Sequence, residues 1–406
     1  MAECFSKRSA VFCSIMLVIG LVLILCLSAF GARNSPVNFR ANQSPEDPNK
    51  ILRFVHTVFR HGPRTPADTY PTDPHFNETF YPYGWGHITN DGKKYMYESG
   101  QWLNQRYGRF LGNLYVPDAV WAQTTGVTRT QMSMATLLAG LFPPRDTAME
   151  WNRRLNWQPI PIFSEPLDED TLLLVRTPCP RYYEALKEVF ESPELKQVER
   201  DNAEMYKELT ELTGMDIKTP DDIQSLYSTL RAESEYGLKL PSWTKNYYPD
   251  KLLNLTELSY IYNVYTDEMK KFKAGPFLEK MINEWNQKKA GVIKPKDRKM
   301  FLYTGHDSTV VNILHAIGVW EQQLPVYGIM AIFELLEDKA TGEYGISIYL
   351  RNSAKSGAIP LTIPGCDHFC PLDQFIELTK KFIIADKASE CAARDKSFTT
   401  PPPSGP

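Results

Sequence analysis

The chain has 406 residues, 43% of them hydrophobic and 23% charged, a composition that excludes a disordered chain and a small disulfide-stapled scaffold. Its 45 Lys plus Arg against 48 Asp plus Glu give a net charge of −3 and no overall basic field, so we expect no nucleic-acid partner. An anionic ligand would instead need a local cluster of arginines.

The N-terminal segment 1–32 has the pattern of a signal peptide or an N-terminal membrane anchor. Lys7 and Arg8 precede an uncharged, mostly apolar run from Ala10 to Ala32. The run is long for a signal peptide and just long enough to cross a bilayer as a helix, so both interpretations stay open. We expect a secreted or lysosomal protein that enters the secretory pathway and contacts a membrane only if this segment is not cleaved. Residues 33–49 are polar and contain prolines, which predicts a linker.

Residues 50–175 alternate strand, loop and helix signals and are expected to form the first part of an α/β core. A β-branched and aromatic segment at 51–59 predicts a buried strand. A helix is expected at 91–110 and a short strand at 119–123, and the next helix begins near Arg129 and stops at a pair of prolines. This order of elements is typical of a sheet covered by helices.

The pattern changes over residues 176–294, where long amphipathic stretches follow one another without a convincing strand, and we expect an inserted helical cap. Residues 295–391 contain strand signals again and are expected to form the second part of the core. Residues 392–406 form a proline-rich tail. The sequence therefore predicts an α/β fold with a mostly parallel central sheet, helices on both faces and an inserted helical cap subdomain.

Four cysteines lie beyond the leader, in a chain expected to fold in an oxidising compartment: Cys179, Cys366, Cys370 and Cys391. An even number predicts two disulfides, for which three pairings exist, and we favour Cys366–Cys370 with Cys179–Cys391. A zinc site at the C-x3-C pair is the alternative, although no second close pair of Cys or His accompanies it. Asn77 and Asn254 each begin an Asn-x-Thr acceptor for N-glycosylation.

The strand at 51–59 runs directly into the heptad Arg60-His61-Gly62-Pro63-Arg64-Thr65-Pro66. Two guanidinium groups flank one imidazole, and arginine binds phosphate oxygens through paired hydrogen bonds. The imidazole can attack phosphorus and form a phosphohistidine, and the adjacent cations help to keep His61 unprotonated. The alternative, a basic turn with a surface histidine, suits an isolated Arg-His pair better than this heptad after a buried strand.

The heptad resembles the R-H-G-x-R-x-P signature of the histidine acid phosphatases. Three further segments are similar to that family, GWGHITNDG at 84–92, GVTRTQMS at 126–133 and YTGHD at 303–307. The C-x3-C pair and the Pro-Leu that follows it also resemble a segment near the family's C-terminus. The resemblance spans residues 50–391 and looks closest to the animal secreted and lysosomal acid phosphatases, including insect venom forms.

The resemblance implies a histidine phosphatase fold that hydrolyses phosphate monoesters at acidic pH, with no metal or other cofactor. It implies that His61 is the nucleophile and that Asp307 donates a proton to the leaving oxygen, a role that works best in acid. The phosphate-binding residues that it implies are Arg60, Arg64, Arg129 and His306. The implied partners are a small-molecule phosphate monoester or a phosphoprotein as substrate, and a second copy of the chain in a homodimer.

One departure and several alternatives accompany this interpretation. Many family members carry Asp where this chain has Pro63, so a donor role at that position is absent. A secreted or tethered pseudophosphatase would bind phosphorylated ligands without turnover. A dinuclear-metal phosphatase is faintly suggested by Asp73-Pro-His75 and His306-Asp307, but the other ligand motifs are missing. His56 either faces the site or is a core histidine, and Asp307 could also cap a helix.

Overall fold

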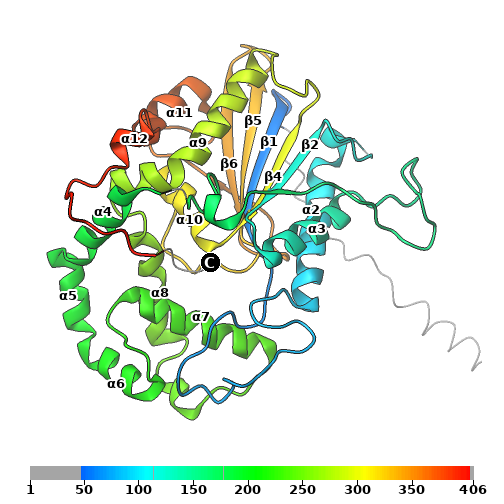
Figure 1. The fold of residues 1–406 in the computed structure, drawn as a ribbon. Helices are drawn as coiled ribbons and strands as arrows, with labels where there is room; N and C mark the ends of the chain where they lie inside the picture. Colours follow the sequence, from blue (N-terminus) through cyan, green and yellow to red (C-terminus); the bar gives the residue numbers. More distant parts are fainter. Residues whose placement is uncertain (1–46, 113, 177, 403–406) are drawn as a thin grey trace, which may run out of the picture. The chain divides into compact units, whose positions relative to one another are not determined.

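The computed structural model describes residues 47–402 except 113 and 177, so the expected leader 1–32 and most of the expected linker lie outside the described residues. The strands are β1 (Lys50–Arg60), β2 (Val120–Thr124), β3 (Phe163–Ser164), β4 (Met300–Gly305), β5 (Met330–Asp338), β6 (Tyr344–Arg351), β7 (Ile359–Leu361) and β8 (Cys370–Pro371). They form one sheet in the order β3-β2-β4-β1-β5-β6-β7, with β8 paired to β6 (Figure 1).

The sheet has a parallel half and an antiparallel half. Strands β3, β2, β4 and β1 are parallel to one another, whereas β5 pairs antiparallel with β1 and with β6. The predicted α/β class is confirmed, but the sheet is mixed and not mostly parallel. The reason is the short connection between β5 and β6, where Asp338 accepts hydrogen bonds from the backbone of Ala340 and Thr341, because a turn of this length permits only an antiparallel hairpin.

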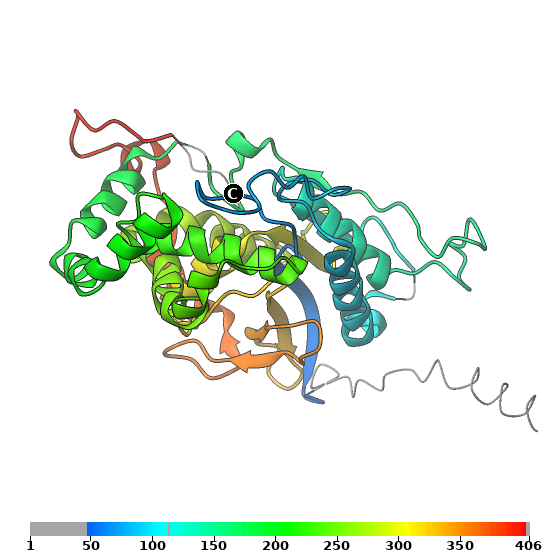
Figure 2. The same ribbon diagram turned by 90° about the horizontal axis from the view of Figure 1, so that it is seen from below.

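Helices cover both faces of the sheet, as expected. Alternate residues of β1 point to opposite sides, so that Phe54 and Val58 join one core cluster while Val55 and Phe59 join another. Helices α9 (Asp267–Lys289) and α10 (Asp307–Ala316) pack on the first side. Helices α2 (Asn90–Leu111) and α3 (Thr128–Leu141) pack on the other side (Figures 1 and 2).

The segment expected to form a cap contains helices and loops but no strand in its described part. Besides α9 it contains α4 (Pro180–Phe190), α5 (Pro193–Asp201), α6 (Ala203–Thr213), α7 (Pro220–Tyr236) and α8 (Asp250–Tyr262). Helices α6, α7 and α8 share a separate core cluster with Tyr70, which lies shortly after the heptad. Helix α9 differs because Phe277 and Trp285 pack directly against the sheet. The division into core and cap stays a prediction, but α7 and α8 lie below the ends of β1 and β4 (Figure 1).

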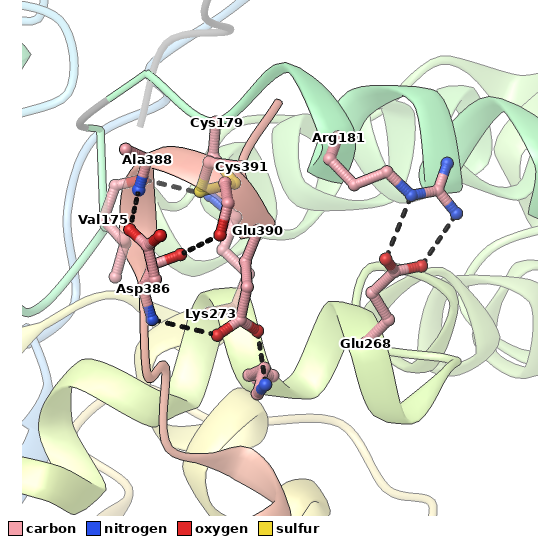
Figure 3. Close-up of a disulfide and its surroundings, with 11 residues drawn as sticks. Val175, Cys179, Arg181, Glu268, Lys273, Asp386, Ala388, Glu390 and Cys391 are labelled. Atoms are coloured by element: carbon pink, nitrogen blue, oxygen red, sulfur yellow. Dashed lines mark hydrogen bonds and ion pairs between the residues drawn. A yellow bond between two sulfur atoms is a disulfide. The ribbon is translucent and has the colours of Figure 1, made fainter. Parts of the chain in front are cut away.

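Two disulfides join the cysteines in the favoured pairing, Cys179–Cys391 and Cys366–Cys370. The first connects the start of α4 to the end of α12 (Lys387–Glu390), which follows α11 (Leu372–Thr379). Figure 3 shows this disulfide near the paired hydrogen bonds from Arg181 to Glu268. Just beyond it, the backbone N–H groups of Arg394 and Asp395 donate to Glu184 of α4, at 2.8 and 2.7 Å. The first part of the tail is therefore attached to the helical segment. Among the described residues, no helix is both long and apolar enough to cross a bilayer.

Candidate active site

The candidate site lies where the parallel strands β1 and β4 end side by side. Arg60 at the end of β1 pairs in register with Gly305 at the end of β4, so the residues that follow the two strands meet. The backbone N–H of His61 donates to the carbonyl of Gly305 at 3.1 Å, and the rings of His61 and His306 have their centroids 5.6 Å apart. The two histidines of the sequence motifs therefore share one site.

His61 is held as a neutral imidazole with one nitrogen available. His61 is only 2% exposed, and its Nδ1 lies 2.9 Å from the carbonyl oxygen of Gly62. Because a carbonyl only accepts hydrogen bonds, Nδ1 carries the proton and Nε2 keeps its lone pair. Burial, followed by the charges of Arg129 and Arg60, holds the pKa of His61 well below its usual value. The expected effect of the arginines is present, although burial is the larger cause.

The backbone of the heptad is fixed by α2 and α3. The N–H of Gly62 donates to Ser133 Oγ at 3.0 Å, and that hydroxyl donates to the carbonyl of Arg129 at 2.7 Å. The carbonyl of Pro63 accepts from the N–H of Thr89 at 3.2 Å, and a Cβ on Gly92 would lie only 2.1 Å from that carbonyl oxygen. Glycine at position 92 thus lets the first turn of α2 approach the heptad closely.

Three arginines of the site are buried or half-buried cations with few partners. Arg60 donates to the carbonyl of Pro325 and forms an ion pair with Asp307 at 2.9 Å. Arg129 is 7% exposed and forms no ion pair with a described residue, while Arg64 donates to the carbonyl of Thr65. Burial and then the charge of Arg64 lower the pKa of Arg129 to about 10.

The Nε atoms of all three arginines are buried without a hydrogen-bond partner among the described residues. One carboxylate, Asp307, faces this group of three guanidinium groups. An excess of buried positive charge is costly unless an anion offsets it. The arginine cluster, defined as Arg60, Arg64 and Arg129, is therefore suited to binding a dianion such as a phosphate group.

His306 lies at the N-terminus of α10 beside this cluster. Its Nε2 is 3.0 Å from Thr125 Oγ1, a residue that follows β2, and its backbone N–H donates to Thr309 Oγ1 at 3.1 Å. Burial and then the charge of Arg129 lower the pKa of His306 to about 3. His306 therefore offers a neutral ring to a ligand even in acid.

Asp307 is the first residue of α10. The N-cap of this helix is His306, so Asp307 does not have the capping role considered for it. Its Oδ2 accepts from Tyr260 Oη at 3.0 Å and pairs with Arg60, and its Oδ1 accepts from the N–H of Ser308. Burial is the largest single effect and raises the pKa of Asp307. The charges of Arg60 and His306 and the hydrogen bonds from Ser308 and Tyr260 together outweigh it, so the pKa lies below its usual value. The lowered pKa favours the ionised form of this carboxyl.

Several contacts of the site come from residues that the sequence did not single out: Thr125, Ser133, Tyr260 and Tyr327. The ring of Tyr327 lies 5.6 Å from that of His61 and 4.3 Å from the guanidinium of Arg60. Tyr260 comes from α8, far away in sequence. Thr125 and Ser133 lie in or beside a motif segment and could have been found there, whereas neither tyrosine carries a local signal.

The remaining candidates lie elsewhere. His56 accepts from Trp285 Nε1 at 3.2 Å through Nδ1 and bonds to Glu284 through Nε2, so it is a core histidine packed against α9. Asn77 and Asn254 are both exposed. In the described part of the chain, no three His, Cys, Asp or Glu side chains gather as ligands for a metal ion, so the residues considered for two metals do not form such a group.

The chain is similar to known proteins over most of its length. The family model of the histidine phosphatase superfamily (branch 2) matches residues 51–344. The prostatic acid phosphatase of Mus musculus is 39% identical over 349 residues, covering 85% of this chain and 90% of the relative. The venom acid phosphatase Acph-1 of Apis mellifera is 36% identical over 351 residues, covering 86% and 88%.

The fold is also that of solved structures. The phytase of Hafnia alvei in complex with tartrate superposes with a TM-score of 0.64 at 18% identity, covering 84% of this chain and 98% of the phytase, a likeness of fold alone. The matches to curated relatives extend over most of both chains. The chain therefore belongs to branch 2 of the histidine phosphatase superfamily and is an enzyme of the acid phosphatase type.

Proposed function

We propose that the chain hydrolyses phosphate monoesters without a metal ion, through a covalent phosphohistidine on His61 and with Asp307 as the proton donor. The observation that carries the proposal is the orientation of the His61 ring. Its Nδ1 is engaged by the carbonyl of Gly62, so the free Nε2 is the nucleophile. The lowered pKa keeps this nitrogen unprotonated at mildly acidic pH.

In the first step the substrate phosphate binds among the arginine cluster and His306. Nε2 of His61 forms a bond to phosphorus while the bond from phosphorus to the ester oxygen breaks, and the leaving oxygen takes the proton of Asp307. The guanidinium groups offset the charge on the equatorial oxygens. In the second step a water attacks phosphorus, its proton returns to Asp307, the P–N bond breaks and inorganic phosphate leaves.

Asp307 must carry a proton for this role, although its pKa lies below the usual value. The largest contribution to the lowering is the charge of Arg60, which forms an ion pair with Asp307. A bound phosphate dianion competes for Arg60 and adds negative charge next to Asp307, and both changes raise the pKa of this carboxyl. We infer that substrate binding raises the pKa of Asp307 far enough for the carboxyl to take up a proton. Acidic pH favours this uptake, so the reaction works best in acid.

The proposed substrates are small-molecule phosphate monoesters or phosphoproteins, and the proposed route is secretory. The two disulfides support an oxidising compartment, as do relatives named as prostatic, venom and lysosomal acid phosphatases. Exposed Asn77 and Asn254 are the proposed glycosylation sites. Treatment of the secreted protein with a glycosidase, compared with Asn77→Gln and Asn254→Gln, would show whether both carry glycans.

Release of phosphate from p-nitrophenyl phosphate at acidic pH in the presence of EDTA tests the function. We expect undiminished turnover in EDTA and a loss of at least about 10³-fold in kcat/KM for His61→Ala, because the nucleophile is gone. His315→Ala, on α10 but absent from the site contacts, is the matched control and should keep its activity. Loss of activity in EDTA would favour the metal alternative, and phosphate binding without release would favour the pseudophosphatase.

A further inference from the structure

A chain of hydrogen bonds connects the helical segment to the proposed proton donor. Gln224 of α7 donates through Nε2 to Tyr260 Oη of α8 at 3.1 Å and to Ser228 Oγ, one turn further along α7, at 2.9 Å. Tyr260 Oη in turn donates to Asp307 Oδ2 of α10 at 3.0 Å. Helix α8 contacts both α7 and α10, so the phenol of Tyr260 links two neighbouring elements (Figure 1).

The direction of these hydrogen bonds follows from the donors available. An amide N–H can only donate, so Tyr260 Oη accepts from Gln224, and its own single proton is left for Asp307. Tyr260 is 6% exposed, and burial, followed by the charge of Asp307, raises the pKa of its phenol. The phenol therefore keeps its proton and remains a donor to Asp307 throughout the acidic range.

Asp307 receives this hydrogen bond on the oxygen that also pairs with Arg60. Oδ2 lies 2.9 Å from Arg60 Nη2, whereas Oδ1 accepts from the N–H of Ser308 at 2.8 Å. In the proposed mechanism a bound phosphate competes with Asp307 for Arg60, whereas Tyr260 is held by its contact with Gln224. The phenol is then the side-chain donor that keeps Oδ2 in place. In the described part of the chain, the other charged or titratable groups that face the Asp307 carboxyl are His306 and Arg129.

We propose that Tyr260 is a positioning residue for the proton donor Asp307, and that its hydrogen bond sets the upper pH limit of catalysis. Gln224 takes part by directing the phenol proton toward the carboxyl. The helical segment supplies both side chains and thus helps to decide at which pH the enzyme works. The inference rests on the proposed role of Asp307 as the proton donor.

The direction of the pH dependence follows from the form of Asp307 that the hydrogen bond favours. A phenol that donates to a carboxylate stabilises the ionised form. Burial raises the pKa of Asp307, and the hydrogen bond from Tyr260 is one of the contributions that together lower it. Because the protonated carboxyl is the active form, kcat falls as pH rises through the pKa of Asp307 in the substrate complex. Removal of the phenol raises this pKa, so the fall in kcat moves to higher pH.

The test is the pH profile of kcat for an alkyl phosphate, measured on the full-length protein and its variants. In Tyr260→Phe we expect the fall in kcat to lie about one pH unit higher than in the wild type, because one hydrogen bond to a charged group is lost. Gln224→Glu keeps the size of the side chain but replaces the donor with an acceptor, which draws the phenol proton away from Asp307, so we expect a shift in the same direction. Tyr262→Phe is the matched control and should keep the wild-type profile, since Tyr262 lies on the same helix but packs in a different core cluster.

A fall in kcat at the same pH in Tyr260→Phe and the wild type, or at a lower pH, would overturn the proposal. A shift in Tyr260→Phe without one in Gln224→Glu would overturn the role of Gln224. The second variant keeps the proposal testable if loss of the phenol impairs folding. Asp307→Asn separates this inference from the proposed function. If that variant retains kcat, Asp307 is not the donor and both fail, whereas a loss of kcat there with an unshifted profile in Tyr260→Phe contradicts the inference alone.

Discussion

At the scale of single residues, the site depends on which of its titratable groups are charged. Burial and neighbouring guanidinium groups keep His61 and His306 neutral, whereas Arg60 keeps Asp307 ionised. In the proposed mechanism these charges attract a phosphate dianion, whose arrival raises the pKa of Asp307 so that it takes up a proton. In the proposed mechanism His61 needs no separate base, because the lone pair of its Nε2 is already free.

Asp307→Asn should separate proton donation from phosphate binding. For an alkyl phosphate, whose leaving alkoxide needs a proton, we expect kcat to fall by about 10²-fold or more. For p-nitrophenyl phosphate, whose leaving phenolate is stable, the loss should be several-fold smaller. Steady-state kinetics on both substrates measures the ratio. Tyr260→Phe is the control, because it removes the hydrogen bonds of Tyr260 to Asp307 and from Gln224 but keeps the carboxyl group. Equal losses on both substrates would contradict the donor role.

The sequence predicts these residues to different degrees. His61, Arg60 and Arg64 are contiguous, so their chemistry is visible in one heptad. Arg129, His306 and Asp307 were assigned by resemblance, because only the pairing of β1, β2 and β4 brings them to the heptad. Tyr260 was missed because a tyrosine on an amphipathic helix has the same pattern whether it packs in a core or bonds to a carboxylate.

At the scale of elements, α2 fixes the heptad through its first turn. Thr89 caps the helix by accepting from Gly92 N–H, while its own N–H donates to Pro63. For the strands β5 and β6, the sequence pattern predicts the strands but not their direction in the sheet. The direction of these strands is set by the hairpin between them, which makes them antiparallel. For this reason the sequence did not lead us to expect a mixed sheet.

Gly92→Ala and Gly108→Ala on the same helix form a matched pair. The added Cβ at position 92 meets the Pro63 carbonyl at 2.1 Å, so we expect the heptad to shift and kcat/KM to fall about tenfold or more. At position 108 the nearest side-chain atoms are 3.9 Å away, and alanine should stabilise the helix by about 0.5–1 kcal/mol with activity unchanged. Kinetics and urea unfolding distinguish the two. Unchanged activity in Gly92→Ala would contradict the importance of this close approach.

At the scale of the whole molecule, the helical segment is joined to the C-terminal region by a long-range disulfide. Cys179 and Cys391 are 212 residues apart, whereas Cys366 and Cys370 are 4 apart. The pairing was favoured from the sequence among three possibilities, and the attachment of the tail to Glu184 was not foreseen because backbone donors leave no sequence pattern.

Removal of each disulfide by paired serine substitutions should affect stability unequally. A cross-link that closes a longer loop restricts the unfolded chain more, so loss of Cys179–Cys391 should cost about 3 kcal/mol more than loss of Cys366–Cys370. Urea unfolding of the two double variants measures the difference. If both variants lose the same free energy of unfolding, the restriction of the unfolded chain is not the main contribution of the longer bridge.

The central claim is that His61 carries the phosphoryl group during turnover. Rapid mixing of enzyme with a phosphate monoester, followed by an alkaline quench and peptide mass spectrometry, measures it most directly, because phosphohistidine survives base. We predict a phosphoryl group on the peptide that contains His61, formed within one turnover and absent from His61→Ala. A phosphoryl group on another residue, or full turnover with no phosphoenzyme detected in Asp307→Asn or the wild type, would contradict the account.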